Sequence, residues 1–218
     1  MIKDNIINIT SKLPSGVRLV AVSKFHPVEK LLEAYEAGQR IFGENRPQEF
    51  AAKVPLMPSD VEWHFLGHLQ TNKLKLVLPH ASLVHSVDSL HLLEAINDWG
   101  VRNGRMVPVL LELHLGAEET KHGMSEEEIL SVLPSADGYT GLSFRGLMGM
   151  ATNTDDSLVI SSDFRRIKAL FDRIRVEFPS LSEFTELSIG MSDDWPLALE
   201  NGATLIRIGT AIFGPREY

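Results

Sequence analysis

The chain has 218 residues, and its hydrophobic fraction of 44% and charged fraction of 23% are those of an ordinary globular protein. It contains no cysteine, which excludes a disulfide framework, a cysteine-zinc site and a cysteine nucleophile. Lys and Arg total 21 against 29 Asp and Glu, and the formal net charge of -8 argues against a nucleic-acid partner. Because we find no secretory signal and no apolar run of membrane-spanning length, we expect a cytoplasmic protein without a membrane partner.

Short apolar runs alternate with amphipathic stretches along almost the whole chain. The first apolar run, 17–22, precedes a helical pattern over 27–35 that opens with a proline and ends before Gly38. Further strands are predicted at 40–43, 61–67, 82–87, 107–113, 144–150, 186–190 and 204–209. Further helices are predicted to open at Pro47, to cover 70–78, 89–99 and 125–133, to present Phe164, Ile167, Phe171 and Ile174 on one face, and to cover 193–200.

Eight strand-helix units with continuously apolar strands predict a parallel sheet covered by helices. We expect them to close into one (β/α)8 barrel of the TIM type over residues 1–218, with a short helix before residue 17. An open doubly wound sheet is the alternative, although no G-x-G-x-x-G motif follows the first strand. In a barrel the active site lies at the C-terminal ends of the strands, so the candidate residues are those that stand there.

Lys24 directly follows the first strand and is expected at the barrel mouth. It is either a surface lysine that keeps its ammonium group in water, or a partly desolvated amine with a lowered pKa. An amine of the second kind forms a Schiff base with a carbonyl compound.

Two glycine-containing segments, 188–192 and 207–210, follow the seventh and eighth strands. Barrels often hold a phosphate group in these two loops, and glycine lets the backbone approach an anion closely. Ser192 is expected to cap the next helix, where free N–H groups either are satisfied by capping or hold a phosphate. Asp193 and Asp194 count against an anion unless their side chains point away. Together the two loops predict a phosphate site.

Arg207 interrupts an otherwise apolar strand, and a buried guanidinium needs an acceptor. It either forms a structural ion pair with Glu44 or Glu186, or it contacts the ring nitrogen of a cofactor. Glu44 and His64 are interpreted as polar core residues with satisfied hydrogen bonds. The histidines show no metal-ligand spacing, and the sequence predicts no metal site.

Six segments resemble the pyridoxal phosphate homeostasis protein family, and they occur in the order typical of that family: 21–24 (AVSK), 42–45 (FGEN), 63–73 (WHFLGHLQTNK), 146–150 (GLMGM), 188–192 (SIGMS) and 207–214 (RIGTAIFG). The family is similar to the barrel domain of alanine racemase and lacks that enzyme's additional β-domain. Two positions depart from the expected pattern. Pro47 follows Arg46 where a non-proline is expected, and His114 stands where asparagine is expected.

The resemblance implies that Lys24 carries pyridoxal 5′-phosphate (PLP) as an internal aldimine, while Ser192, Gly209 and Thr210 hold the phosphate group. It also implies that Arg207 faces the pyridine nitrogen and that Asn45 lies near the cofactor. The family has no firmly established reaction and is associated with intracellular vitamin B6 balance. PLP-dependent apo-enzymes are the candidate recipients of the cofactor.

A limit on catalysis follows from the same residues. PLP is the strongest electron sink when its ring nitrogen is protonated, which an arginine neighbour disfavours. None of the three tyrosines, Tyr35, Tyr139 and Tyr218, ends a strand, so a second acid/base group for racemisation is missing. We therefore expect a PLP carrier or regulator without an efficient reaction. The alternatives are a weak PLP-dependent amino-acid racemase and, less favoured, a cofactor-free barrel enzyme for a phosphorylated substrate with Lys24 as an aldolase-type base.

Overall fold

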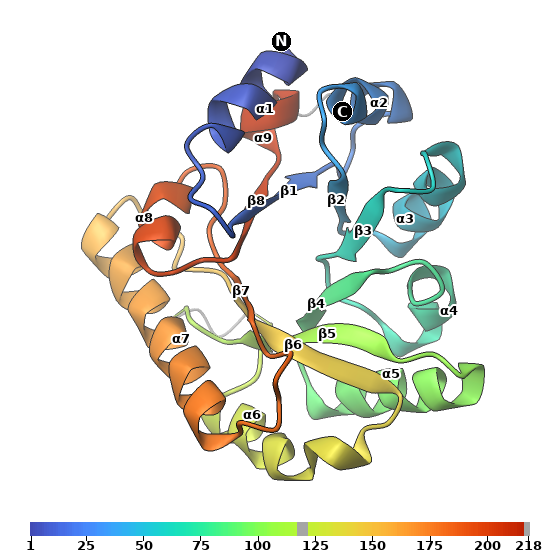
Figure 1. Cartoon of the computed structure of the whole chain (residues 1–218), viewed down its shortest axis with the longest axis vertical. Helices are drawn as coiled ribbons and strands as arrows, with labels where there is room; N and C mark the ends of the chain where they lie inside the picture. Colours follow the sequence, from blue (N-terminus) through green and yellow to red (C-terminus); the bar gives the residue numbers. More distant parts are fainter. Residues whose placement is uncertain (117–121, 216–218) are drawn as a thin grey trace.

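The computed structural model describes residues 1–116 and 122–215. Eight parallel strands follow one another around a closed barrel, and the last strand pairs with the first (Figure 1). Closure confirms the predicted (β/α)8 barrel and rules out the open sheet. The strands are β1 (Arg18–Val22), β2 (Ile41–Glu44), β3 (Glu62–Phe65), β4 (Leu83–Val87), β5 (Val107–Leu113), β6 (Leu142–Gly149), β7 (Glu186–Ser188) and β8 (Leu205–Ile208).

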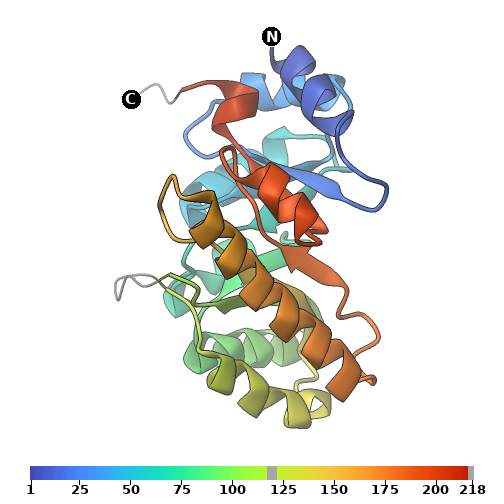
Figure 2. The same ribbon diagram turned by 90° about the vertical axis from the view of Figure 1, so that its left-hand side faces the viewer.

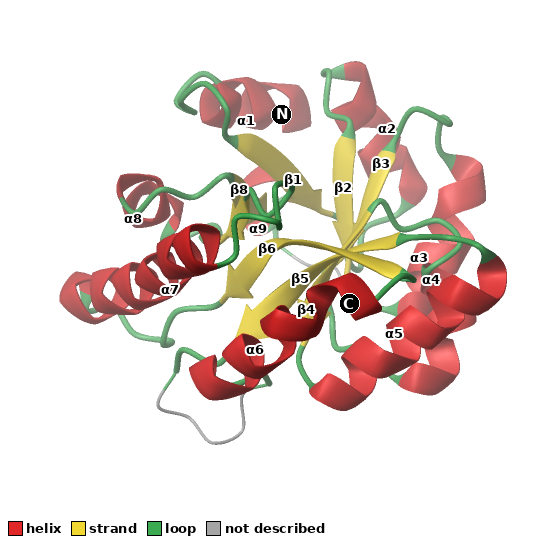
Figure 3. Cartoon of the chain, turned by 60° about the horizontal axis from the view of Figure 1, so that its bottom comes forward, coloured by secondary structure: helices red, strands yellow, loops and turns green. Residues whose placement is uncertain are grey.

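Helices surround the barrel and cover the outer face of the strands (Figure 3). They are α1 (Ile2–Thr10), α2 (Val28–Glu36), α3 (Pro47–Lys53), α4 (Leu74–Val77), α5 (Leu90–Asn103), α6 (Glu126–Val132), α7 (Ser157–Glu177), α8 (Trp195–Glu200) and α9 (Thr210–Phe213). Short 3-10 turns occupy Val54–Leu56, Thr71–Lys73 and Leu133–Gly138. The predicted short leading helix is α1, which packs beside α9 at one end of the molecule, where the Asn5 amide donates to the Ile212 carbonyl (Figure 2). No helix in the described ranges is long and apolar enough to cross a membrane.

The apolar core has two parts because the strands are buried on both faces, as expected for a parallel sheet. The larger part fills the space between the strands and the surrounding helices. A smaller cluster fills the barrel interior and consists of Val20, Ile41, Leu83, Leu110, Met148 and Leu205. Side chains alternate along a strand, so polar residues two positions from these on the same strands also face the interior. His85 on β4, Glu112 on β5 and Arg207 on β8 are buried residues of this kind.

Local signals set the ends of several helices. Ser125 caps α6 in a reciprocal capping box with Glu128, and Gly104, with a φ of 60°, ends α5 in the left-handed conformation. The helix predicted over 70–78 is instead a 3-10 turn followed by the single turn of α4. The helix predicted from residue 193 begins at Trp195, which changes the role of the loop before it.

Candidate cofactor site

A cavity of about 270 Å³ opens at the C-terminal ends of the strands, where a barrel carries its active site. Every site residue predicted from the sequence lines it: Lys24, Asn45, Ser192, Arg207, Gly209 and Thr210. The remaining lining residues are Val22, Leu66, Met148, Met150, Met191 and Asp193. The strands that contribute are mainly β1, β2, β6, β7 and β8, so the cavity occupies one side of the barrel mouth.

Lys24 is half-buried and lies two residues beyond Val22, which also lines the cavity. The chain turns sharply after it, because Phe25 has a φ of 67°, the one positive value found at a non-glycine in the described ranges. Left-handed backbone of this kind costs about 1–2 kcal/mol at a residue with a side chain. The turn is held in place by α3: the Phe25 N–H donates to Glu49 Oε2 at 2.9 Å, and the Arg46 guanidinium stacks on the Phe25 ring. Strain supported in this way marks a residue whose position matters.

Asn45 lines the cavity, and its side chain also carries a buried polar atom without a partner. Its side-chain Oδ1 is buried and accepts no hydrogen bond from the described part of the chain. Gly67, two residues beyond the end of β3, permits this close approach, because a Cβ at Gly67 would lie 2.1 Å from the Asn45 carbonyl oxygen. A buried acceptor without a donor costs about 1–3 kcal/mol, so the cavity favours a ligand that supplies a donor here.

Arg207 is buried, and its partners correct one alternative from the sequence. The predicted ion pair with Glu44 or Glu186 is wrong, because Lys53 pairs with Glu44 and Arg18 pairs with Glu186. The Arg207 guanidinium donates instead to neutral oxygens: to the Ser188 carbonyl and hydroxyl, each at 2.7 Å, and to the Gly149 carbonyl at 3.0 Å.

Burial lowers the pKa of Arg207 to about 10, so the group keeps its charge at neutral pH. Asp194 and Glu112 attract that charge from farther away. Burial in turn raises the pKa of Glu112 to about 7, assisted by the charge of Asp88. The cavity is therefore lined by a cation with no carboxylate in direct contact among the described residues, which suits a ligand that carries negative charge or an acceptor atom.

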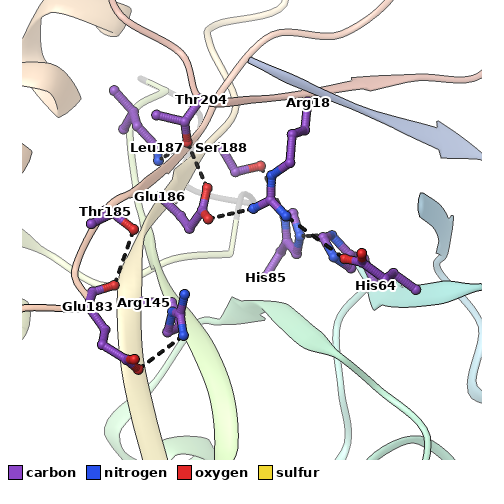
Figure 4. A network of polar contacts seen from close by, with 11 residues as sticks. Arg18, His64, His85, Arg145, Glu183, Thr185, Glu186, Leu187, Ser188 and Thr204 are labelled. Atoms are coloured by element: carbon purple, nitrogen blue, oxygen red, sulfur yellow. Dashed lines mark hydrogen bonds and ion pairs between the residues drawn. The ribbon is translucent and has the colours of Figure 1, made fainter. Parts of the chain in front are cut away.

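A chain of hydrogen bonds leads from Arg207 through the barrel interior. Figure 4 shows Ser188, His85 and His64, which continue this chain. The Ser188 hydroxyl lies 2.9 Å from His85 Nδ1, and His85 Nε2 lies 2.9 Å from His64 Nδ1. Because Ser188 Oγ accepts from Arg207, the consistent arrangement has the Ser188 O–H donating to His85 Nδ1 and His85 Nε2–H donating to His64 Nδ1. Both imidazoles are then neutral.

The energetics of burial agree with that arrangement. Burial lowers the pKa of His64 to about 3, with a contribution from the nearby charge of Arg18. Burial, together with the charges of Arg207 and Arg18, holds the pKa of His85 well below its usual range. His64 and Arg18 also line a cavity of about 150 Å³ at the opposite end of the barrel. The predicted role of His64 as a satisfied polar core residue is confirmed, and the chain of hydrogen bonds extends it to the cofactor cavity.

The loop after β7 differs from the expectation in its capping. Ser192 does not cap a helix: α8 begins at Trp195, and the Asp194 carboxylate accepts from the Met191 N–H inside its own loop. Asp194 is thereby directed to the backbone of that loop, whereas the exposed Asp193 stays among the residues that line the cavity. Ser192 thus lines the cavity without being consumed as a helix cap.

Glycine is required at two positions around this loop. Gly190 has a φ of 91°, and a Cβ on it would lie 2.6 Å from Ala198 Cβ. A Cβ on Gly209 would lie 3.1 Å from the Val22 carbonyl oxygen. The close approach of β8 to β1 therefore crowds any side chain at Gly209, which also lines the cavity.

Sequence reasoning missed the residues that support the site. Ser188 was noted only as part of a loop, and His85 and Lys53 were not singled out at all. The alternation of side chains along a strand could have indicated Ser188 and His85. Ser188 stands at an inward position of β7, as Arg207 does on β8. His85 stands at an inward position of β4, as His64 does on β3. No tyrosine in the described ranges lines the cavity: Tyr35 bonds to Asp60 on the exterior and Tyr139 packs on Phe144, while Tyr218 lies outside those ranges.

The fold and the cavity define a class of protein: an eight-stranded parallel barrel that presents a lysine beyond its first strand and a buried arginine on its last. Known proteins are similar to this chain in sequence and in fold. The family model described as alanine racemase, N-terminal domain, matches residues 1–217. The pyridoxal phosphate homeostasis protein of Vibrio alginolyticus is 37% identical over 232 aligned positions, covering 100% of this chain and 98% of the relative. That of Schizosaccharomyces pombe is 38% identical and covers 92% of this chain and 85% of the relative.

Solved structures agree. PipY of Synechococcus elongatus PCC7942 with PLP bound has a TM-score of 0.91 and 38% identity, and the match covers 98% of this chain and 100% of PipY. Alanine racemase of Bartonella henselae shares the fold alone, with a TM-score of 0.75, 16% identity, and coverage of 99% of this chain and 58% of the racemase. The chain therefore belongs to the pyridoxal phosphate homeostasis protein family, as the sequence motifs predicted.

Proposed function

We propose that this protein binds PLP covalently through Lys24 and takes part in intracellular PLP homeostasis, without an efficient reaction of its own. The observation that carries the proposal is the meeting of all six predicted residues around one cavity at the barrel mouth. The relative PipY, 38% identical along nearly its whole length, is known with PLP bound. PLP-dependent apo-enzymes are the proposed recipients of the cofactor.

The residues of the cavity fit the chemical groups of PLP. In this proposal the Lys24 amine condenses with the PLP aldehyde and releases one water molecule. Ser192, Gly209 and Thr210 bind the phosphate group, because they combine a serine and a threonine hydroxyl with a backbone that an anion can approach. The unpartnered Asn45 Oδ1 accepts a hydrogen bond from a donor on the cofactor.

Arg207 is the residue that favours binding of PLP without catalytic turnover. Bound PLP supplies an electron sink, which is strongest when its ring nitrogen is protonated. A guanidinium offers only donors, so Arg207 facing that nitrogen favours its unprotonated form. The chain of hydrogen bonds through Ser188 and His85 keeps Arg207 in place. With no tyrosine lining the cavity in the described ranges, a second acid/base group of that kind is missing, and racemisation is disfavoured.

The test of the covalent site is chemical. Purified protein loaded with PLP is reduced with borohydride and mapped by peptide mass spectrometry, and we expect the pyridoxyl group on Lys24. Lys24→Ala is expected to lose the visible absorption of bound PLP. The control is Lys75→Ala on the exposed face of α4, which should keep it. A label on another lysine, or an unchanged spectrum in Lys24→Ala, contradicts the assignment.

Activity is tested separately. We expect the PLP-loaded protein to racemise alanine far below the usual enzymatic range of about 1–1000 per second. Turnover within that range by the purified protein favours the alternative of a racemase. A colourless protein that cannot be loaded with PLP favours the cofactor-free barrel enzyme instead.

A further inference from the structure

Three side chains from three neighbouring strand ends converge on the other side of the barrel mouth: His68 beyond β3, Asp88 beyond β4 and His122 beyond β5. His68 Nδ1 lies 2.6 Å from Asp88 Oδ2, and His122 Nδ1 lies 3.7 Å from the same oxygen. The two imidazole rings stack, with their centroids 4.4 Å apart. One ligand atom from each residue lies within 4.8 Å of both others.

The charges in this cluster favour a cation. The Asp88 side chain is only 5% exposed, whereas His68 and His122 are 46% and 60% exposed. In the described part of the chain, the ion pairs of Asp88 are with these two histidines, and no lysine or arginine lies within ion-pair distance of it. A second buried carboxyl, Glu112, lies within the field of Asp88. A cation bound beside this buried carboxylate would neutralise its charge.

We propose that His68, Asp88 and His122 form a binding site for a divalent transition-metal ion, with zinc as the preferred ion. Two imidazole nitrogens and one carboxylate oxygen are a ligand set that zinc accepts, and the hard cations magnesium and calcium prefer all-oxygen sites. Three protein ligands leave a fourth, open position toward solvent, as in zinc sites that bind an exchangeable water or a substrate.

The geometry reaches metal coordination through small rotations. Ligand atoms that share a tetrahedral zinc ion at about 2.0–2.1 Å lie about 3.3 Å apart. The distance from Asp88 Oδ2 to His68 Nδ1 must therefore lengthen, and the distance to His122 Nδ1 must shorten. Both histidines are about half exposed and have room to turn, while the buried Asp88 stays fixed at the end of β4 beside Ser89, the cap of α5.

This site could not be predicted from the sequence, because its ligands are not close to one another in the chain. His68 and Asp88 belong to consecutive strand-helix units, and His122 belongs to the next one, so the three ligands form no short motif. The His-x-x-x-His spacing of His64 and His68 is not part of the site, because His64 is bonded to His85 in the barrel interior. The site also does not depend on the proposed function: none of its three residues lines the cofactor cavity. A failure of PLP binding and a failure of metal binding are therefore separate results.

Calorimetric titration of the chelator-treated, dialysed protein with zinc chloride at pH 7.5 tests the proposal. We expect one zinc ion per chain, no competition from a large excess of magnesium, and weaker binding as the pH falls and the histidines become protonated. His122→Asn and His68→Asn should each weaken zinc binding at least tenfold. His91→Asn, which removes an exposed histidine from α5, is the matched control and should leave it unchanged.

Cobalt gives a second, spectroscopic readout of the same site. The cobalt-loaded protein should show the visible absorption of a tetrahedral ion, and His122→Asn should lose it. The absence of a stoichiometric zinc ion overturns the proposal. An equal loss of zinc binding in His91→Asn and His122→Asn also overturns it, because that result would show scattered binding to surface histidines. His68 and His122 would then share only a proton with Asp88. PLP loading of His122→Asn should match the wild type in either case.

Discussion

The two buried cations among the described lysines and arginines, Lys53 and Arg207, are neutralised in opposite ways. The Lys53 ammonium contacts two carboxylates, Glu44 at 2.6 Å and Glu49 at 3.2 Å. Within residues 1–116 and 122–215, Arg207 donates to carbonyl and hydroxyl oxygens alone. The chain itself neutralises Lys53, as is expected of a structural cation, whereas Arg207 lines a cavity without a carboxylate in contact among the described residues, as is expected of a cation that binds a ligand. The comparison separates structural from functional charge without reference to relatives.

Lys53 nevertheless acts close to the cofactor site. Its ammonium also donates to the Ser23 carbonyl at 2.9 Å, and the Ser23 hydroxyl donates to Glu44 at 2.6 Å. Ser23 directly precedes Lys24. The Lys53 cluster therefore fastens α3 to the end of β1 and fixes the point from which Lys24 enters the cavity. In the proposed function, one buried ion cluster holds the backbone before Lys24, and the second buried cation is left to contact PLP.

The largest effect is expected from Lys53→Met. Removing one partner of a buried ion pair leaves Glu44 uncompensated, which typically costs about 3–5 kcal/mol of unfolding free energy. Because Lys53 does not line the cavity but holds the end of β1, most of the loss should already appear without PLP, with a smaller further loss in the PLP-loaded form. Denaturant titrations of both forms measure it. Adding Glu44→Gln to the variant should recover part of the loss, and a loss confined to the PLP-loaded form would contradict the structural role.

Arg207→Glu is expected to give the opposite pattern. A carboxylate beside the ring nitrogen favours its protonation, so the visible spectrum of bound PLP should shift near neutral pH. The PLP-loaded form should lose at least about 1.4 kcal/mol more stability than the PLP-free form, which corresponds to a tenfold loss of affinity. Paired denaturant midpoints and absorption spectra measure both effects.

The control for Arg207→Glu is Arg145→Glu, which reverses the charge of a half-buried arginine that is paired with Glu183 and does not line the cavity. It should leave the PLP spectrum unchanged. If Arg207→Glu destabilises both forms equally and its spectrum is also unchanged, Arg207 does not contact the cofactor. The assignments of Lys24 and of the phosphate loops would remain.

The sequence was sufficient for the fold because each strand and helix carries its own periodicity, and parallel units of this kind close in chain order. It was sufficient for the cavity residues because strand ends meet at one end of a barrel. It failed at Ser192, because the Asp194 carboxylate bonds to Met191 and moves the helix start to Trp195. It also failed for the partners of Arg207, which depend on the register between strands: β6 and β7 place Gly149 and Ser188 beside β8. Register is a property of the assembled sheet.

The smallest expected effect is a pH dependence of the unfolding free energy. It arises from the histidines in the chain of hydrogen bonds that ends at Arg207, and not from the Lys53 cluster. His64 and His85 lie on the chain of hydrogen bonds that ends at Arg207, and burial lowers the pKa of His64 to about 3. An unfolded histidine has a pKa of about 6.5, so between about pH 3 and pH 6.5 this histidine binds a proton in the unfolded chain and not in the folded chain. The contribution of the neutral His64 to the free energy of unfolding is therefore complete above about pH 6.5. It is lost as the pH falls, by up to about 1.4 kcal/mol per pH unit. Glu112, with its pKa raised to about 7, changes stability in the opposite direction over part of this range, and it does so in every variant that keeps it.

His64→Gln isolates the histidine contribution. The glutamine amide oxygen can still accept from His85 Nε2–H, so the chain of hydrogen bonds is kept while one titrating group is removed. Unfolding free energies of the PLP-free protein at pH 6.5, 6.0, 5.5 and 5.0 should fall less steeply in His64→Gln than in the wild type, by about 1 kcal/mol per pH unit. In Lys53→Met, the contribution of the two histidines to the slope of unfolding free energy against pH should be unchanged, because neither imidazole contacts the Lys53 cluster. Parallel slopes for His64→Gln and the wild type would mean that His64 takes up its proton in the folded barrel, and the neutral, one-directional chain from Arg207 to His64 would then be wrong.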